Sequence, residues 1–272
     1  MRLLTYRTAS GTSAGRQDGD EVVTLPYTDV GALLADDDWE ARARADGERQ
    51  PLAGLDLAPV VPAPSKVFCV GLNYLLHVQE GSADVPDYPT LFAKFPDALT
   101  GPFDDITVPS TTEAVDWEAE MVVVIGKTVR DADEAGAEAA IAGFTVGNDL
   151  SMRDWQRRTL QWLQGKTWDR GSPVGPALVT RDEVGSARPD LAISCLVDGV
   201  VMQDARTSSL IFDPVTLVSY ASTVVTLRPG DLIFTGTPDG VGAARTPPQF
   251  LKPGNVMTTR IEGLGEQVNR FV

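Results

Sequence analysis

The sequence predicts a mainly β fold with α+β elements, in which a small N-terminal α+β domain precedes a larger body. Short apolar and β-branched runs, separated by glycine and proline turns, outnumber helical patterns from residue 66 onward. Residues 1–58 are polar, begin with a strand-like run and have a charged middle. The proline-rich stretch 59–65 favours extended backbone and predicts a linker between this domain and the body, residues 66–272.

Composition narrows the class of protein. A hydrophobic content of 43% and a charged content of 22% are ordinary for a globular protein with a sizeable core. The formal net charge of −15 argues against nucleic acid as a partner. The chain has no apolar run of the ~20 residues that a membrane helix needs, and its start lacks the apolar core of a signal peptide. We therefore expect a cytoplasmic protein with no membrane partner.

The thiol and imidazole side chains limit the available chemistry. Cys69 and Cys195 are the only cysteines, and both lie in apolar strand-like runs, so we expect buried free thiols. His77 is the only histidine. This excludes a metal site built from several histidines and leaves a single imidazole as a candidate base.

The strongest chemical signal is a pair of acids on one predicted strand. Glu118 and Glu120 lead into the β-branched run 122–125, and strand alternation places them on the same face. Two carboxylates entering a core together are costly unless a cation neutralises them or one takes up a proton. Asp149, which ends the predicted strand 143–149, completes an oxygen-only set that suits Mg²⁺, Mn²⁺ or Ca²⁺ better than Zn²⁺. The alternative is that the acids lie at the solvent-facing mouth of an edge strand and bind nothing.

A candidate base follows the predicted strand 66–71. If residues 74–80 form a helix, His77 and Glu80 lie at i,i+3 on one face. The carboxylate can then hold the imidazole in one tautomer, which is the base-plus-orienter arrangement of general base catalysis. The alternative is a surface helix with a chance His/Glu pair.

A helix is predicted over residues 152–163, with Ser151 as its N-cap. Arg153 and Gln156 then fall at i,i+3 in its first turns, close to the third acid. Arg153 can grip a carboxylate, and Gln156 can hydrogen-bond a carbonyl. Lys166 lies in the loop after this helix, where it is either an electrophile that returns to the site or a solvated lysine.

Further polar groups lie near the other predicted strands. Lys94 ends a short strand, where it can meet an anionic substrate or face solvent. The glycine-rich segment 236–242 lacks the spacing of a P-loop or dinucleotide loop. Gly236 and its neighbours can bring backbone N–H groups to a substrate carboxylate, and Thr237 adds a hydroxyl donor. The remaining predicted elements are helices over 131–142 and from Asp213 to about 225, hairpins over 191–203 and 256–272, and a strand over 232–235.

The order of these motifs is that of a known family. The relevant residues are Gly71-Leu72-Asn73-Tyr74, His77, Glu80, Phe92-Ala93-Lys94, Glu118-Ala119-Glu120, Asn148 to Arg153, Gln156, Lys166, Gly230-Asp231, Thr235 to Pro238 and Gly240 to Gly242. They resemble the fumarylacetoacetate hydrolase family over residues 66–272, with similarity to acylpyruvate hydrolases and 2-hydroxyhepta-2,4-diene-1,7-dioate isomerases. The resemblance implies a mixed β-sandwich roll, a variable N-terminal domain and a homodimer. Leu72 departs from it, because many relatives have arginine there.

The resemblance implies an enzyme that acts on small 2-oxo or 1,3-dicarbonyl acids. The leading hypothesis is hydrolysis of a C–C bond in a 2,4-dioxo acid of the acylpyruvate or fumarylacetoacetate kind. Mg²⁺ or Mn²⁺, with Ca²⁺ also fitting, would be held by Glu118, Glu120 and Asp149 and would stabilise the enolate that forms on cleavage. The implied catalytic residues are His77, which Glu80 orients to deprotonate a water, and Lys166, which stabilises the oxyanion. The implied substrate-binding residues are Asn73, Lys94, Arg153, Gln156, Gly236 and Thr237.

Other reactions fit the same set of residues. The site can decarboxylate β-keto acids such as oxaloacetate, or isomerise or dehydrate unsaturated 2-oxo acids, with His77 as a proton shuttle or dispensable. A protein that binds metal and ligand without turnover is a third hypothesis, which the intact pair of His77 and Glu80 argues against. The products separate the reactions, because they are two carbon fragments, CO₂ or a mass-neutral shift of a double bond.

Overall fold

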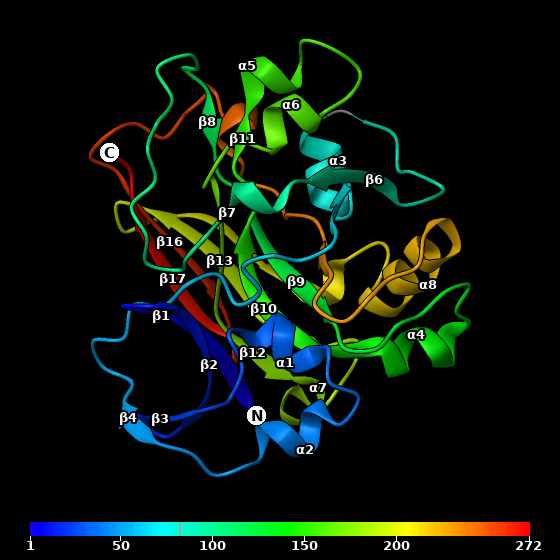
Figure 1. Ribbon diagram of the computed structural model, residues 1–272. Helices are drawn as coiled ribbons and strands as arrows, with labels where there is room; N and C mark the ends of the chain where they lie inside the picture. The colour runs from blue at the N-terminus through cyan, green and yellow to red at the C-terminus, as the bar shows by residue number, and fades with distance from the viewer. Residues whose placement is uncertain (82) are drawn as a thin grey trace.

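The computed structural model describes residues 1–81 and 83–272 (Figure 1). Strands form one large sheet, a four-stranded sheet and a two-stranded pair, and short helices lie at their margins. The predicted mainly β fold with α+β elements is confirmed. The large sheet contains β1 (Arg2–Thr8), β2 (Gly11–Asp18), β3 (Glu21–Thr24), β4 (Arg49–Pro51), β5 (Val67–Gly71), β6 (Thr90–Lys94), β7 (Leu99–Thr100), β9 (Ala119–Ile125), β10 (Ile141–Asn148), β12 (Ser172–Thr180) and β15 (Leu232–Phe234).

The smaller sheets and the helices complete the fold. The four-stranded sheet contains β13 (Ala192–Val197), β14 (Val200–Arg206), β16 (Val256–Ile261) and β17 (Gly265–Arg270), and the pair is β8 (Val115–Asp116) with β11 (Ser151–Met152). The α-helices are α1 (Val30–Leu34), α2 (Trp39–Ala43), α3 (Leu75–Glu80), α4 (Glu134–Ala140), α5 (Arg153–Gln156), α6 (Leu163–Lys166), α7 (Arg181–Val184) and α8 (Pro214–Val224). Both predicted hairpins and the helix capped by Asp213 are present.

Strand β9 lies in the interior of the large sheet, between β10 and β15. All seven of its residues are buried because both faces of the sheet are covered. Met121 and Val123 pack with residues of the four-stranded sheet, whereas Val122 and Val124 pack with the N-terminal helices. Glu120 lies on this interior strand and Glu118 directly before it, and both are buried, which removes the alternative that they are solvated on an edge strand.

The N-terminal segment joins the large sheet directly. Strand β1 pairs antiparallel with β12, with Arg2 opposite Val179 and Leu3 opposite Leu178. Leu3 and Leu33 also share one buried cluster with residues of the central strands. The stretch predicted as a linker, 59–65, forms no helix or strand in this described part of the chain, yet its two valines are buried. The segment 1–58 is thus packed onto the body across sheet and core.

Only the first turn of the helix predicted over 152–163 forms, as α5. An irregular segment follows, and α6 begins at Leu163, where the predicted helix would end. Ser151 does not cap this helix, because it pairs with Asp116 in the two-stranded β8–β11 ladder. Gly165 returns the chain against Gln156, and a Cβ at Gly165 would lie 2.5 Å from the Gln156 Cβ. This close packing buries Lys166 at the end of α6 instead of leaving it in a solvated loop.

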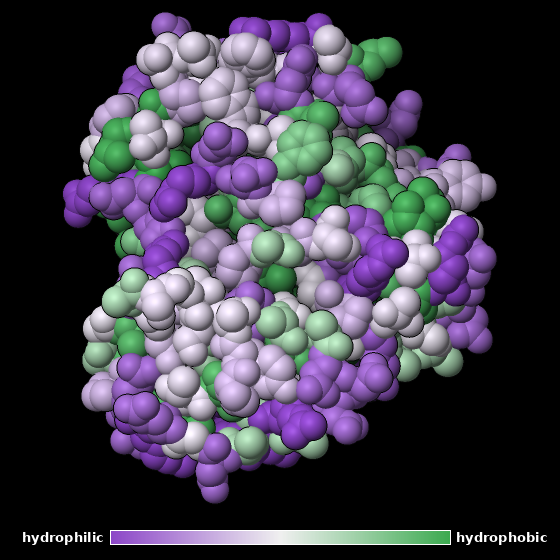
Figure 2. All heavy atoms as spheres, in the orientation of Figure 1, coloured by the Kyte–Doolittle hydropathy of each residue, from purple (hydrophilic) through white to green (hydrophobic). Residues whose placement is uncertain are grey.

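The face of the molecule in Figure 2 is mostly polar and includes an apolar region. Figure 2 shows hydrophobic residues gathered over the part of the molecule where Figure 1 places α3 and α8. Exposed apolar side chains there include Leu75 and Leu76 of α3, and Tyr88 stacks on Tyr220 of α8. Among the described residues, no helix combines the length and the apolar character that crossing a bilayer requires.

Candidate metal centre and active site

Three acids meet where β9 and β10 run side by side. Glu120 lies opposite Gly147 in this antiparallel pair, and the backbone N–H of Asp149 donates to the Glu118 carbonyl at 2.9 Å. The ladder thereby brings Asp149 beside Glu118 and Glu120, and one carboxylate oxygen of each lies within 4.8 Å of the others. All three acids are buried. A compact set of oxygen ligands of this kind fits a hard divalent cation such as Mg²⁺, Mn²⁺ or Ca²⁺.

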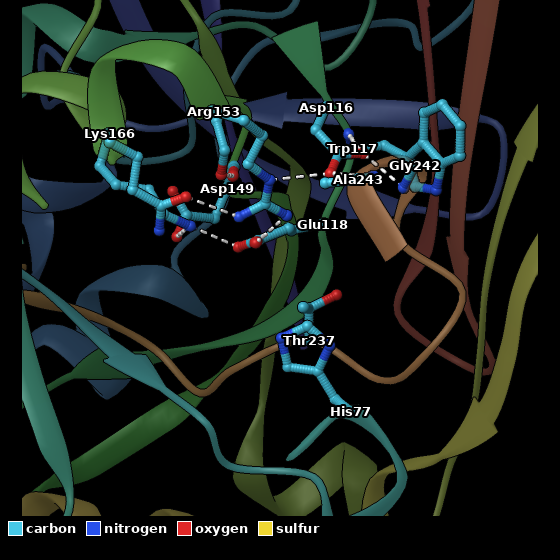
Figure 3. A network of polar contacts seen from close by, with 12 residues as sticks. His77, Asp116, Trp117, Glu118, Asp149, Arg153, Lys166, Thr237, Gly242 and Ala243 are labelled. Carbon is cyan, nitrogen blue, oxygen red and sulfur yellow. Dashed lines mark hydrogen bonds and ion pairs between the residues drawn. The ribbon is translucent and has the colours of Figure 1, made fainter. Parts of the chain in front are cut away.

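Two lysines and an arginine surround these acids (Figure 3). Lys166 Nζ lies 2.5 Å from Glu118 Oε2 and 2.9 Å from Asp149 Oδ2. Lys94 Nζ lies 2.5 Å from Asp149 Oδ1, and Arg153 Nη2 lies 2.6 Å from Glu118 Oε1. Burial opposes ionisation of Glu118, but the nearby Lys166 and Arg153 cations outweigh it and hold the pKa of this carboxyl well below its ordinary value.

Glu120 has a different environment from the other two acids. No ion pair joins it to a cation within the described residues, and its Oε2 accepts a hydrogen bond of 2.7 Å from the Gly236 backbone N–H. Burial, followed by the charges of Asp149 and Glu118, raises the pKa of Glu120 well above its ordinary value. Glu120 is therefore the acid of the three that most needs a cation in order to ionise.

The predicted base and its orienter are in contact. His77 Nδ1 lies 2.8 Å from Glu80 Oε1, and Glu80 Oε2 accepts from the Gly240 backbone N–H at 3.0 Å. Because the Glu80 carboxylate is an acceptor, Nδ1 carries the imidazole proton and Nε2 is left as the free lone pair. His77 lines the same cavity as the three acids and faces them from the side of Thr237 (Figure 3).

Arg153 is held from behind by a residue that sequence reasoning missed. Its Nε lies 2.8 Å from Asp116 Oδ2, and its Nη1 lies 2.9 Å from Gln156 Oε1. Asp116 also accepts backbone N–H groups of Gly242 at 2.6 Å and of Ala243 at 3.0 Å. Its place directly before Trp117 and the acidic strand was the only signal in the sequence. Asp116 thus joins the glycine-rich loop to the arginine.

The hydrogen bonds of the glycine-rich loop, residues 236–242, differ from those that we expected. The Gly236 N–H donates to Glu120 instead of being free for a substrate carboxylate. The Thr237 hydroxyl donates to the Ala119 carbonyl at 2.9 Å and accepts from Gln203 Nε2 at 2.8 Å. Thr237 does line the cavity. Its hydroxyl is already in two hydrogen bonds, and Gln203, on β14, gave no signal in the sequence.

Two predicted substrate-binding residues have supporting contacts instead. The Asn73 side chain donates to the Phe212 and Thr235 carbonyls at 3.0 and 2.7 Å and accepts from the Phe212 N–H at 2.8 Å. Lys94 is buried between Asp149 and the Lys166 carbonyl. Neither residue lines the cavity. Asn73 anchors the turn after β5, and Lys94 neutralises Asp149, while their contacts with a substrate stay predictions.

The cavity between His77 and the acids has a volume of about 140 Å³. Its lining contains charged or polar residues and apolar ones. Leu72, one of the apolar residues, has a φ of 57°, a left-handed conformation that leucine rarely adopts and that often marks functional segments. The apolar lining residues are Val70, Gly71, Leu72, Phe92 and Trp162. Trp162 was not identified from the sequence, because the break between α5 and α6 that directs it inward was not predicted.

Comparison with known proteins establishes the protein family to which this chain belongs. The fumarylacetoacetate (FAA) hydrolase C-terminal family model matches residues 66–272. This chain therefore belongs to the fumarylacetoacetate hydrolase family, as the motifs indicated. Similar proteins carry the names of different enzymes, so the family alone does not name the reaction.

Three relatives illustrate the range. The chain is 48% identical over 218 residues to the mitochondrial oxaloacetate tautomerase FAHD2A of Bos taurus. The matched segment covers 79% of this chain and 69% of that protein. The 2-hydroxyhepta-2,4-diene-1,7-dioate isomerase of Mycobacterium marinum is 33% identical, with a TM-score of 0.82 over 100% of this chain and 98% of that one. The fumarylacetoacetate hydrolase of Exiguobacterium antarcticum is 29% identical, with a TM-score of 0.87 over 100% and 99%. Similar proteins are thus enzymes.

Proposed function

We propose that this protein is a divalent-metal-dependent enzyme that moves a proton between the keto and enol forms of a small 2-oxo acid of the oxaloacetate kind. One observation carries the proposal. His77, oriented by Glu80, faces three buried acids across one small cavity. The name of the Bos taurus relative, an oxaloacetate tautomerase 48% identical to this chain, supports the choice of substrate.

The proton moves in two steps through the imidazole. His77 Nε2 removes a proton from the carbon beside the carbonyl, the C–H electrons form a C=C bond, and the carbonyl π electrons move to oxygen. The protonated ring, held by Glu80, then returns the proton to that oxygen and gives the enol. Lys166, an ammonium on the cavity wall, stabilises the transient negative charge. A divalent cation on the three acids would add Lewis-acid stabilisation of the same charge.

The enol absorbance of oxaloacetate provides the test. We expect rapid enol–keto conversion with Mg²⁺ or Mn²⁺ and its loss after EDTA. The substitution His77→Ala should abolish conversion but leave Mn²⁺ affinity, measured by calorimetry, within about twofold, because no ion pair or hydrogen bond joins His77 to the three acids in the described structure. A parallel loss of metal affinity and activity would contradict the assigned role.

Hydrolysis of an acylpyruvate is the second candidate. The similarity to a solved fumarylacetoacetate hydrolase favours it, as does the buried ammonium of Lys166 on the cavity wall. In this reaction His77 takes a proton from water, the water oxygen bonds to the distal carbonyl carbon, and the C–C electrons pass to the pyruvate enolate, which is then protonated. Formation of pyruvate and acetate from acetylpyruvate would establish this reaction, whereas release of CO₂ from oxaloacetate would indicate a decarboxylase.

The assembly and the compartment stay predictions. We propose a homodimer, as the family resemblance implies, and the apolar side chains around α3 are consistent with a contact surface. Sedimentation velocity on the full chain tests this, and a monomer at micromolar concentration would contradict it. The predicted cytoplasmic location is likewise a proposal that fractionation of the native cells would test.

A further inference from the structure

The residues that line the cavity are of two kinds. The three acids, Lys166, Arg153 and His77 are charged or polar, whereas Val70, Gly71, Leu72, Phe92 and Trp162 are apolar. The carboxylate and the carbonyl of a 2-oxo acid suit the charged and polar lining. The volume of about 140 Å³ is well below the roughly 300 Å³ at which drug-sized pockets begin. Only a short chain fits.

The indole of Trp162 is one of the apolar groups that line the cavity. Its ring meets the Phe92 ring edge-on, with centroids 5.6 Å apart and an interplanar angle of 70°. On the other side it lies directly on the backbone of Gly71, where an added Cβ would be 2.3 Å from Cζ3 and 2.9 Å from Cη2. The indole therefore occupies space that only glycine at position 71 leaves free.

The position of Trp162 is also fixed from its own element. It directly precedes α6, which packs on α5 through Gly165, and Gln164 Nε2 donates to the Trp155 carbonyl at 3.0 Å. Lys166 ends the same helix, four residues after Trp162. At 1.5 Å of rise per residue, the two backbones are about 6 Å apart along the helix axis. One short helix thus sets the spacing between Lys166 and Trp162.

We propose that Trp162 determines specificity by limiting the chain length of the 2-oxo acid, so that the site accepts acids with four or five carbons and excludes longer ones. This inference rests on the proposed function, because it takes a 2-oxo acid as the ligand. The seven-carbon substrate named for the Mycobacterium marinum relative is then too long for this cavity.

The test is a series of 2-oxo dicarboxylic acids of increasing length. Oxaloacetate, 2-oxoglutarate, 2-oxoadipate and 2-oxopimelate are titrated by calorimetry into the Mn²⁺-loaded full chain, and binding is measured rather than turnover. Because one methylene in a hydrophobic pocket changes affinity roughly 10- to 200-fold, we expect wild-type affinity to fall at least tenfold between 2-oxoglutarate and 2-oxoadipate. In Trp162→Ala this fall should disappear, while oxaloacetate affinity changes by less than about threefold.

Two further variants distinguish a specific role of Trp162 from a general loss of packing around the cavity. Trp168 packs on Trp155 but does not line the cavity. The variant Trp168→Phe should therefore keep the wild-type length dependence. Gly71→Ala should weaken binding of every length by forcing the indole aside, and the double variant with Trp162→Ala should regain binding. Recovery would show that the two residues act through their contact.

The outcomes are distinguishable from failure of the proposed function. If the wild type binds Mn²⁺ but no 2-oxo acid, the proposed function is wrong and this inference falls with it. If 2-oxo acids bind and Trp162→Ala keeps the wild-type length dependence, only the role of Trp162 is overturned. The same holds if Trp168→Phe removes the length dependence as fully as Trp162→Ala does.

Discussion

At the scale of single residues, hydrogen bonds fix what His77 can do. Glu80 accepts from Nδ1 and from the Gly240 backbone, so the ring is held as the Nδ1–H tautomer. Because His77 is the only histidine, its ¹⁵N signals need no assignment. We predict an Nδ1–H pattern in the wild type and a mixture of tautomers in Glu80→Gln, with kcat/KM reduced about 10²-fold or more. An unchanged tautomer in the variant would contradict this role of Glu80.

Another single-residue effect is that the raised pKa of Glu120 makes the free energy of unfolding depend on pH. Burial and two neighbouring carboxylates raise its pKa, so the folded protein keeps a proton that the unfolded chain releases near pH 4–4.5. Without divalent metal, stability should therefore fall as pH rises above that range, by at most about 1.4 kcal/mol per pH unit for this proton. The unfolding free energy of Glu120→Gln, measured by urea denaturation with EDTA, should fall less steeply with rising pH than that of the wild type. An equal slope in both proteins would refute the prediction.

At the scale of elements, the packing of α6 on α5 positions both Lys166 and Trp162. Gly165→Ala introduces a Cβ about as close to Gln156 as a covalent neighbour, at 2.5 Å. We predict a loss of about 1–3 kcal/mol in the free energy of unfolding, typical of overpacking, together with a large loss of activity. Gly136→Ala in α4, a helix outside the site, is the matched control and should keep full activity. Equal activity losses in both variants would show that the effect is not local.

At the scale of the whole molecule, the N-terminal segment and the body share one sheet and one core. Leu33 of α1 is buried in the cluster that includes Val122 and Leu232 of the central strands. Leu33→Ala should therefore lower the unfolding free energy by about 2–5 kcal/mol in a single transition that also abolishes Mn²⁺ binding. Leu52→Ala, at the half-buried margin of a small separate cluster, should cost less. Two separated transitions would instead favour an independent N-terminal domain.

Much of the site was readable because its residues are close in sequence or on regular elements. Strand alternation placed Glu118 and Glu120 together, and the i,i+3 spacing placed His77 against Glu80. The motif order also identified the family, which the comparison confirmed. Lys94 and Asn73 were predicted near the substrate. The sequence does not show that Lys94 is buried against Asp149 or that Asn73 binds the backbone of Phe212 and Thr235, because these contacts join distant segments.

The sequence by itself determined the chemistry of this protein: an oxygen-only acidic set, one oriented imidazole and a mainly β fold. Those properties depend on residue type and short-range periodicity, which the chain displays directly. Only the tertiary structure decided the break between α5 and α6, the burial of Lys166 and the position of Trp162. Each of these depends on a contact between distant segments, such as Gly71 with Trp162, and the packing free energy of such contacts outweighs local helix preference.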